Sequence, residues 1–412
     1  MTGMAEQTYL IERLGSRGDG IAEGPVYAPL TLPGETVSGN LNGSELTNIK
    51  VIDPSSSRVS PVCRHFKSCG GCQLQHGSNE FVEGWKREIV ERALNAYGLN
   101  PDIRPVFTSE PQSRRRATLS AKRTKKGAMA GFHARASGMI IEIPDCKLLH
   151  PDLMAALPVA EALARIGASR RGELNVSATL TEAGLDIAVE GGVPADGPLM
   201  NTLAQEARRF DLARLAWNGE ILATQRPPAC TFGNATVVPP AGAFLQATQS
   251  GEAALLSAVT EITQGASRIV DLFAGCGTFA LPLTELAEVH AVEASHDMMQ
   301  ALDDGWRKAA GLKPLTIEIR DLFRRPLLPD ELARFDACVI DPPRAGADAQ
   351  IAELARAGIA KIAHLSCNPI TFSRDTNILV QAGYTIDWVQ IIDQFRWSSH
   401  IELAASFTLT SA

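Results

Sequence analysis

No apolar run in this 412-residue chain approaches the roughly 18 residues that a membrane-spanning helix needs. The segment MTGMAEQTYLIERLG lacks the basic stretch followed by an apolar stretch that marks a secretory signal. Basic residues are in the minority, because 39 Lys and Arg stand against 46 Asp and Glu and leave a formal net charge of −7. We therefore expect a cytoplasmic protein without membrane contact, one that does not coat nucleic acid through its overall charge. A monomer is our default expectation.

Hydrophobic residues make up 45% of the chain and charged residues 21%, which is the balance of a globular protein. The length predicts two or three domains. Short β-like stretches broken by Gly, Pro and Asn predict a small β-barrel in residues 1–56. A central domain of mixed character follows in 57–235, and its amphipathic helix over about 79–97 is expected to pack on the last domain. In residues 236–412, apolar strands alternate with Gly-rich turns and helices, so this part is predicted to be an α/β domain with a parallel sheet.

Acidic residues are absent between Ser113 and Arg135, although the whole chain is acidic. The alternation in RRRATLSAKR predicts a strand and hairpin with one basic face. A local face of this kind favours a nucleic-acid partner, because cationic side chains neutralise phosphates. The basic residues of the stretch are Arg114, Arg115, Arg116, Lys122, Arg123, Lys125, Lys126 and Arg135.

Three of the eight cysteines, Cys63, Cys69 and Cys72, fall within ten residues of one another. In a chain without secretory features, such a group favours metal binding over a disulfide framework. The other five cysteines are scattered.

Acidic residues follow two of the apolar strands in the last domain. Asp271 comes at the end of an apolar run, with two glycines in the turn that follows, and Glu293 ends the next strand 22 residues later. An acid at this spacing can accept hydrogen bonds from the ribose hydroxyls of a nucleoside cofactor. Because only GCG is present instead of a full G-x-G-x-x-G, S-adenosylmethionine fits better than a dinucleotide. A tight turn without a ligand remains the alternative for the glycines alone.

Two further strand ends carry reactive groups. Asp341 begins DPPR, and Cys367 stands between Ser366 and Asn368. The carboxyl ends of parallel strands meet at one edge of the sheet, where ligands bind in this class of fold. A cysteine in that position is a candidate nucleophile once its thiolate is stabilised, although a lone cysteine is more often a small buried hydrophobe.

Together, DLFAGCGTF, DPPRAG, SCNPIT and the C-terminal H-x-E resemble the RNA 5-methyluridine (uracil-C5) methyltransferases over nearly the whole chain. GSRGDGIAEG and LPGETV resemble the TRAM domain of the rRNA branch of this family. The resemblance implies a Rossmann-like class I methyltransferase domain behind a TRAM/OB-like barrel and a central α+β domain that carries a metal cluster. It also implies RNA as the partner, with 23S rRNA favoured over tRNA by the TRAM-like segment and the cluster.

The resemblance further assigns roles to individual residues. Four cysteines resemble the ligands of that branch's [4Fe–4S] cluster, and their 3+1 spacing favours a cluster over zinc, which stays open as the alternative. Cys367 is the implied nucleophile and Glu402 the implied base. The cluster ligands would be Cys63, Cys69, Cys72 and Cys146, and contacts to S-adenosylmethionine or the base would come from Gln246, Phe273, Glu293 and Asp341, with Asp321 serving the adenine.

The chain departs from the family pattern at several positions. Arg396 stands where a proline is common and Trp397 follows it, His364 replaces a tyrosine, and Thr248 replaces an asparagine. The changes at Arg396 and Trp397 fall in the loop before Glu402 and leave Glu402 in register. A catalytically silent RNA-binding scaffold is one alternative function, but Cys367 and Glu402 are both retained.

An amino-group methyltransferase is a second alternative. Such an enzyme needs an aromatic residue after the two prolines, where this chain has Arg344, and it needs no cysteine. We therefore predict an active uracil-C5 methyltransferase.

Overall fold

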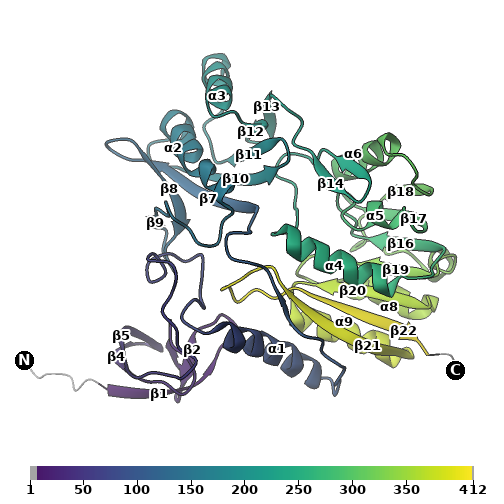
Figure 1. Cartoon of the computed structure of the whole chain (residues 1–412), viewed down its shortest axis with the longest axis horizontal. Coiled ribbons are helices and arrows are strands. Elements are labelled where there is room, and N and C mark those ends of the chain that lie inside the picture. Colours follow the sequence, from purple (N-terminus) through teal and green to yellow (C-terminus); the bar gives the residue numbers. More distant parts are fainter. Residues whose placement is uncertain (1–6, 411–412) are drawn as a thin grey trace, which may run out of the picture.

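The computed structural model describes residues 7–410, which form several sheets and the helices that cover them (Figure 1). The first sheet is a closed barrel with the strand order β1-β2-β3-β5-β4, filled by Ile11, Val37 and Leu46. It confirms the predicted barrel for 7–53, whereas residues 1–6 lie outside the described residues. Its strands are β1 (Gln7–Leu14), β2 (Gly20–Ala22), β3 (Val26–Ala28), β4 (Thr36–Asn42) and β5 (Glu45–Asp53).

The central part contains a seven-stranded sheet in the order β13-β12-β11-β10-β7-β8-β9. Apolar residues on one face of α2, including Val159 and Leu163, pack on this sheet. A two-stranded ribbon then leads to the last sheet. The elements are β7 (Arg116–Arg123), β8 (Ala128–His133), β9 (Ile140–Ile141), the 3₁₀ turn η1 (Pro151–Ala155), α2 (Ala156–Gly167), β10 (Glu173–Thr181), β11 (Gly184–Glu190), α3 (Gly197–Arg209), β12 (Arg214–Trp217), β13 (Glu220–Thr224), β14 (Cys230–Phe232) and β15 (Ala235–Val237).

The last sheet has eight strands in the order β18-β17-β16-β19-β20-β22-β21-β6. The four strands predicted from apolar runs are β16, β17, β19 and β20, and they pair in parallel. The antiparallel pairs of β22 with β20 and β21 extend the sheet. Its elements after residue 240 are α4 (Gln249–Ile262), β16 (Arg268–Leu272), α5 (Ala280–Leu283), β17 (Glu288–Glu293), α6 (His296–Lys308), β18 (Leu315–Ile319), α7 (Pro329–Leu332), β19 (Ala337–Ile340), α8 (Asp348–Ala357), β20 (Lys361–Ser366), α9 (Pro369–Gln381), β21 (Tyr384–Asp393) and β22 (Leu403–Leu409).

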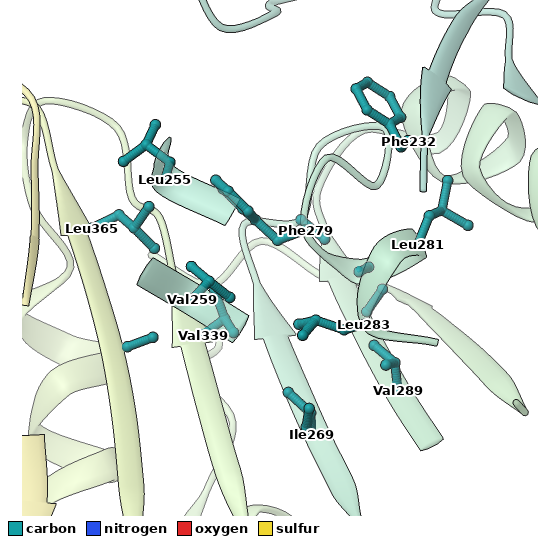
Figure 2. Close-up of a cluster of buried hydrophobic side chains, with 14 of the residues drawn as sticks. Phe232, Leu255, Val259, Ile269, Phe279, Leu281, Leu283, Val289, Val339 and Leu365 are labelled. Atoms are coloured by element: carbon teal, nitrogen blue, oxygen red, sulfur yellow. The ribbon is translucent and has the colours of Figure 1, made fainter. Parts of the chain in front are cut away.

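Helices cover both faces of this sheet. On one face, Leu255 and Val259 of α4 lie over Val339 and Leu365 of the sheet (Figure 2). The other face is covered by α8 and α9. Because the strands are buried on both sides, their sequences are continuous apolar runs without alternation. Among residues 7–410, no helix is both long and apolar enough to cross a membrane.

Two elements from the first half of the chain join the last sheet. Helix α1 (Asn79–Asn95) packs on α9 through Val90 and Leu94, which lie in the same apolar cluster as Phe372. Strand β6 (Phe107–Thr108) pairs in parallel with the end of β21. The helix expected over about 79–97 therefore lies against the sheet of residues 268–409. The division of the chain at residues 56 and 235 stays a prediction.

The basic stretch forms the predicted strand and hairpin, but its three consecutive arginines do not share an open basic face. Arg115 pairs with Glu252 of α4 at 2.5 Å, and both side chains are largely buried. The Arg114 guanidinium lies 5.7 Å from the Phe395 ring centre and that of Arg116 lies 5.2 Å from the Phe244 ring centre. The prediction of one basic face is therefore wrong for these arginines, because Arg115 pairs with a carboxylate and Arg114 and Arg116 lie against aromatic rings.

Candidate active site

The strand ends of the last sheet surround a cavity of about 540 Å³. All seven residues that the sequence assigned to the cofactor or to catalysis line it. Five follow parallel strands of the sheet, one precedes α4 and one precedes β22. They are Gln246, Phe273, Glu293, Asp321, Asp341, Cys367 and Glu402.

The turn after β16 shapes one wall of the cavity. Phe273 has a φ of +63°, and Gly277 has a φ of +94°. A Cβ on Gly277 would lie 2.8 Å from a Leu281 side-chain carbon, so only glycine fits there. The helix expected after this turn is only the four residues of α5. The turn therefore brings the backbone at Gly275 to the cavity wall beside the Phe273 ring.

Glu293 is held in a fixed orientation at the end of β17. One carboxylate oxygen accepts hydrogen bonds from the backbone N–H of Ala294 at 2.8 Å and of Ser295 at 3.0 Å, and the other accepts from Gly275 at 3.2 Å. A carboxylate fixed in this way at the second strand end can receive the hydroxyls of a ribose. The residue lies where the sequence analysis expected a nucleoside cofactor to bind.

Two phenylalanine rings form another part of the wall. Phe273 and Phe323 lie 5.4 Å apart between ring centres, and Phe323 is 49% exposed. The Asp321 carboxylate accepts a hydrogen bond from the Phe323 N–H at 3.0 Å. An exposed aromatic ring beside a fixed carboxylate suits a purine. No sequence motif pointed to Phe323, although its place two residues after a strand-end acid was a usable signal.

Three titratable groups lie together at the other end of the cavity. Burial raises the pKa of Asp341 to about 7. Burial also raises the pKa of Glu402 well above its ordinary value, and the charge of Asp341 raises it further. For the Cys367 thiol, burial and then the two carboxylates raise the pKa to about 11, while Arg344 acts in the opposite direction. The two carboxyl groups therefore hold at least one proton between them near neutral pH.

Gln394 connects the two sides of this site. Its amide nitrogen donates to Gln246 Oε1 at 2.6 Å and to Glu402 Oε2 at 3.3 Å, and its amide oxygen accepts from the Ala247 N–H at 2.8 Å. The bond to Glu402 fixes the carboxyl group relative to the cavity. Gln394 could not be recognised from the sequence, because its role depends on how the chain folds back between β21 and β22.

The four cysteines assigned to a metal cluster lie near the segment between β21 and β22. Burial raises the pKa of Cys69, Cys72 and Cys146, and the nearby Cys63 thiol raises the pKa of each of them further. The N–H of Gly71 donates to Cys69 Sγ at 3.4 Å. Within residues 7–410, no group of three or more His, Cys, Asp or Glu side chains is arranged to hold a metal ion. A metal centre is therefore not shown.

The surroundings of these four thiols fit a metal cluster. Leu148 donates its N–H to Cys146 Sγ at 3.5 Å, and Phe66 and Trp397 pack beside Cys72 in an apolar group. Backbone N–H groups and apolar neighbours are what the sulfurs of a buried metal cluster require. The four cysteine side chains are therefore suited to bind a metal cluster as thiolates.

The sheet with its strand-end cavity defines a class I, S-adenosylmethionine-dependent methyltransferase. The chain is 43% identical to an uncharacterized RNA methyltransferase of Rhizobium meliloti, over 98% of this chain and 99% of the relative. It is 31% identical to the 23S rRNA (uracil(1939)-C(5))-methyltransferase RlmD of Shewanella sp., over 98% of this chain and 96% of the relative. Residues 318–408 match the tRNA (uracil-5-)-methyltransferase family. The protein therefore belongs to the S-adenosylmethionine-dependent RNA uracil-C5 methyltransferases.

A solved structure has the same fold. The Pyrococcus abyssi tRNA (uracil-54, C5)-methyltransferase in complex with S-adenosyl-L-homocysteine aligns with a TM-score of 0.77 over 98% of this chain and 100% of that chain. Its sequence is 20% identical. The similarity therefore extends to the barrel and the central part as well as to the last sheet.

Proposed function

We propose that this protein forms 5-methyluridine in 23S rRNA, acting as a monomer in the cytoplasm. The observation that carries the proposal is that Cys367, Asp341 and Glu402 line the same cavity as the residues assigned to the cofactor. The relative from Shewanella sp., which is named for 23S rRNA, supports rRNA as the substrate because the chain covers nearly all of it.

In the proposed site, the residues around the strand ends hold the methyl donor. Glu293 receives the ribose hydroxyls, and Phe273 and Asp321 border the adenine. Gln246, which lies 2.6 Å from Gln394, borders the part nearest the uracil. S-adenosylmethionine, when bound, supplies an electrophilic methyl group in this cavity.

Uracil C5 is a weak nucleophile, and Cys367 solves this problem. Its thiolate adds to C6, and the electron pair of the C5–C6 bond moves toward O4, which makes C5 nucleophilic. C5 then takes the methyl group from the sulfonium of the cofactor, and S-adenosylhomocysteine is left. A carboxylate of Glu402 accepts the C5 proton, the electrons of that C–H bond re-form the C5–C6 double bond, and the C6–S bond breaks to release the thiolate.

The raised pKa values fit these roles. A thiol with a pKa of about 11 is mostly protonated at neutral pH, so a base must take its proton as the uracil enters. The neighbouring carboxyl pair can do so, because burial raises the pKa of Asp341 to about 7. The pair then passes one proton to uracil O4, where negative charge develops, and this leaves Glu402 ionised; O4 releases that proton to water as C5 takes the methyl group.

The test is methyl transfer to unmethylated 23S rRNA transcribed in vitro, with tRNA transcripts as the competing substrate. Cys367→Ala should abolish transfer and also the covalent adduct with 5-fluorouridine-substituted rRNA, while S-adenosylhomocysteine binding is retained. Cys230→Ala is the matched control, since Cys230 is buried away from the cavity lining. Transfer only to tRNA would replace rRNA as the substrate, and no transfer by the wild type would favour the silent scaffold.

We also propose that Cys63, Cys69, Cys72 and Cys146 hold a [4Fe–4S] cluster. Their 3+1 spacing, their gathering in one place and the N–H donors to two of the sulfurs support it. The protein should be purified without oxygen and analysed for iron, zinc and a broad visible absorption band. Iron with sulfide should be found, and Cys69→Ser should reduce it. Zinc without iron would overturn the cluster in favour of zinc.

A further inference from the structure

A second cavity adjoins the catalytic one. It has a volume of about 690 Å³ and shares Arg344 and Cys367 with the catalytic cavity. A third cavity of about 920 Å³ continues from it toward the barrel, and both are lined by Arg13, Arg17 and His400. The three cavities therefore form one path that runs from Cys367 to the turn between β1 and β2. We call the part outside the catalytic cavity the barrel groove.

The barrel groove carries cationic side chains that have no partner among the described residues. Arg13 and Arg17 are exposed, and among residues 7–410 no side chain or carbonyl forms an ion pair or hydrogen bond with either guanidinium. In contrast, Asp19 in the same wall is already paired with Arg135 at 2.5 Å. The unpaired charges leave this groove suited to phosphate, because a guanidinium binds phosphate oxygens in a bidentate manner.

An apolar side chain lines the same cavity as these arginines and the nucleophile. Ile370, in the first turn of α9, is 73% exposed and lines the groove together with Cys367. Its position is fixed, because Asn368 caps the helix by accepting the Ile370 N–H at 3.1 Å and also donates to the Arg344 carbonyl at 3.0 Å. A rigidly placed apolar group in a cationic groove can pack against the face of a nucleobase, while the phosphates of the same strand bind the arginine side chains.

We propose that the barrel groove binds the single-stranded RNA that flanks the target uridine, with Arg13 and Arg17 on its phosphates and Ile370 against the neighbouring base. An enzyme that acts on a base must take it out of its stack, and this leaves the next base with an uncovered face. Ile370 covers that face beside Cys367. This inference rests on the proposed function and adds the path of the substrate and the residue that positions it.

The phosphate contacts are tested with Arg13→Gln/Arg17→Gln and a fluorescein-labelled oligouridine. The double variant should bind the oligouridine at least tenfold more weakly, and the slope of log Kd against log salt should fall by about 1.4, or about 0.7 per lost phosphate contact. S-adenosylhomocysteine binding should stay unchanged. Arg356→Gln is the matched control, because Arg356 is exposed on α8 outside the cavities and should behave as the wild type.

The exposed tip of the β7–β8 hairpin is the competing surface. If Lys125→Gln/Lys126→Gln weakens oligouridine binding and reduces the salt slope while Arg13→Gln/Arg17→Gln does neither, the RNA crosses the hairpin and the barrel groove is wrong. Loss in the arginine variant alone supports the groove.

The role of Ile370 is tested with 5-fluorouridine-substituted 23S rRNA, on which the covalent adduct accumulates. Ile370→Ser should form the adduct about tenfold more slowly at saturating RNA, and Ile370→Leu should restore the rate. Equal rates for the serine variant and the wild type would overturn the role. If the wild type forms no adduct and transfers no methyl group, the proposed function fails. If it does both and all groove variants match it, only the groove fails.

Discussion

At the scale of single residues, the pair Asp341 and Glu402 should govern how methyl transfer depends on pH. Burial raises the pKa of Asp341 to about 7, and burial with the charge of Asp341 raises that of Glu402. Below that pH both groups are protonated and cannot accept a proton from Cys367 or from C5. We therefore expect single-turnover rates to rise as the pH passes through about 7 and then to level off.

Asp341→Asn separates this pair and supplies the control. The variant lacks the group whose pKa is about 7, while burial still raises the pKa of Glu402, so the rise of the rate near pH 7 should be lost. S-adenosylhomocysteine binding, measured over the same pH range, should not follow the profile. A rate that falls as the pH increases from 6 to 8 would contradict the assignment of this pair.

The His364 ring packs among aromatic side chains in the core and stays neutral in the folded protein. Its ring lies 5.2 Å from Phe372 and 6.3 Å from Phe407 between centres, and within residues 7–410 neither ring nitrogen has a partner. Burial lowers its pKa to about 3. Between that value and about 6.5, the unfolded chain binds a proton that the folded chain does not, so stability falls as the pH falls, by up to about 1.4 kcal/mol per pH unit.

His364→Phe should therefore stabilise the protein, and more at low pH than at high pH. The substitution removes the loss of stability at acid pH and also two unpaired buried nitrogens. Together, these changes should raise the free energy of unfolding by about 2 to 3 kcal/mol at pH 5 and by about 1 kcal/mol at pH 8. Urea unfolding at the two pH values measures both gains. A gain that is the same at both would show that His364 titrates normally in the folded protein.

The residues found from sequence were those that follow strands. Cys367, Asp341 and Glu293 come after apolar runs, and parallel strands must bring their ends to one edge of the sheet. Gln394 and Phe323 could not be found in this way, because their contacts depend on the conformation of turns. Glu402 was found through the H-x-E resemblance, since a lone acid near a C-terminus has no signal of its own.

At the scale of elements, the segment 393–402 is held in place at Arg396 and Trp397, the two positions in it that depart from the family pattern. Arg396 donates to Asn79 Oδ1 at 2.9 Å and to the Ser109 carbonyl at 3.1 Å. The Trp397 carbonyl accepts from the N–H groups of Gln73 and Leu74 at 2.8 and 3.0 Å. The loop before Glu402 is thereby tied to the start of α1 and to the segment that follows Cys72. Sequence alone could register these substitutions but not their partners, which lie some 290 to 325 residues earlier in the chain.

A buried ion pair makes the same connection at the other end of the segment. Lys86 of α1 lies 2.6 Å from Asp393, and both side chains are at most 1% exposed. Lys86→Met leaves the carboxylate buried without its partner, so we expect a loss of about 3 to 5 kcal/mol in the free energy of unfolding. Lys86→Met/Asp393→Asn should recover part of that loss, because no charge is left unpaired. Urea unfolding of both variants measures it, and a double variant less stable than the single one would contradict this account.

The basic hairpin shows the limit of charge patterns. The alternation in RRRATLSAKR correctly predicted a strand, because side chains alternate along it. It could not show that Glu252 and Phe244, over a hundred residues later, would meet Arg115 and Arg116. A cluster of like charges in sequence is therefore evidence for a partner, and the partner here is another part of the same chain.

At the scale of the whole molecule, the first half of the chain completes the last sheet. Helix α1 packs on α9, β6 extends the sheet beside β21, and Ile103 lies in the apolar cluster of that face. Sequence periodicity gave the helix, but β6 has only two residues and no periodic signal. Its pairing follows from the path of the chain between the barrel and the hairpin.

Residues 236–412 should therefore not fold well alone. Without α1 and β6, the face formed by α9 and β21 exposes apolar side chains that Val90, Leu94 and Ile103 cover in the full chain. We expect the fragment to bind a dye for exposed apolar surface and to unfold in urea without a sharp transition. Residues 57–412 are the matched control, since they lack only the barrel and keep both elements.

The two fragments should also separate cofactor binding from RNA binding. Residues 57–412 keep every residue of the catalytic cavity but lose Arg13 and Arg17, so they should bind S-adenosylhomocysteine as the full chain does and oligouridine more weakly. Residues 236–412 should bind S-adenosylhomocysteine weakly, because the sheet that carries its site is incomplete. The shorter fragment could instead unfold cooperatively and bind S-adenosylhomocysteine with the affinity of the full chain. In that case, residues 236–412 fold without α1 and β6, and the sheet does not need these elements.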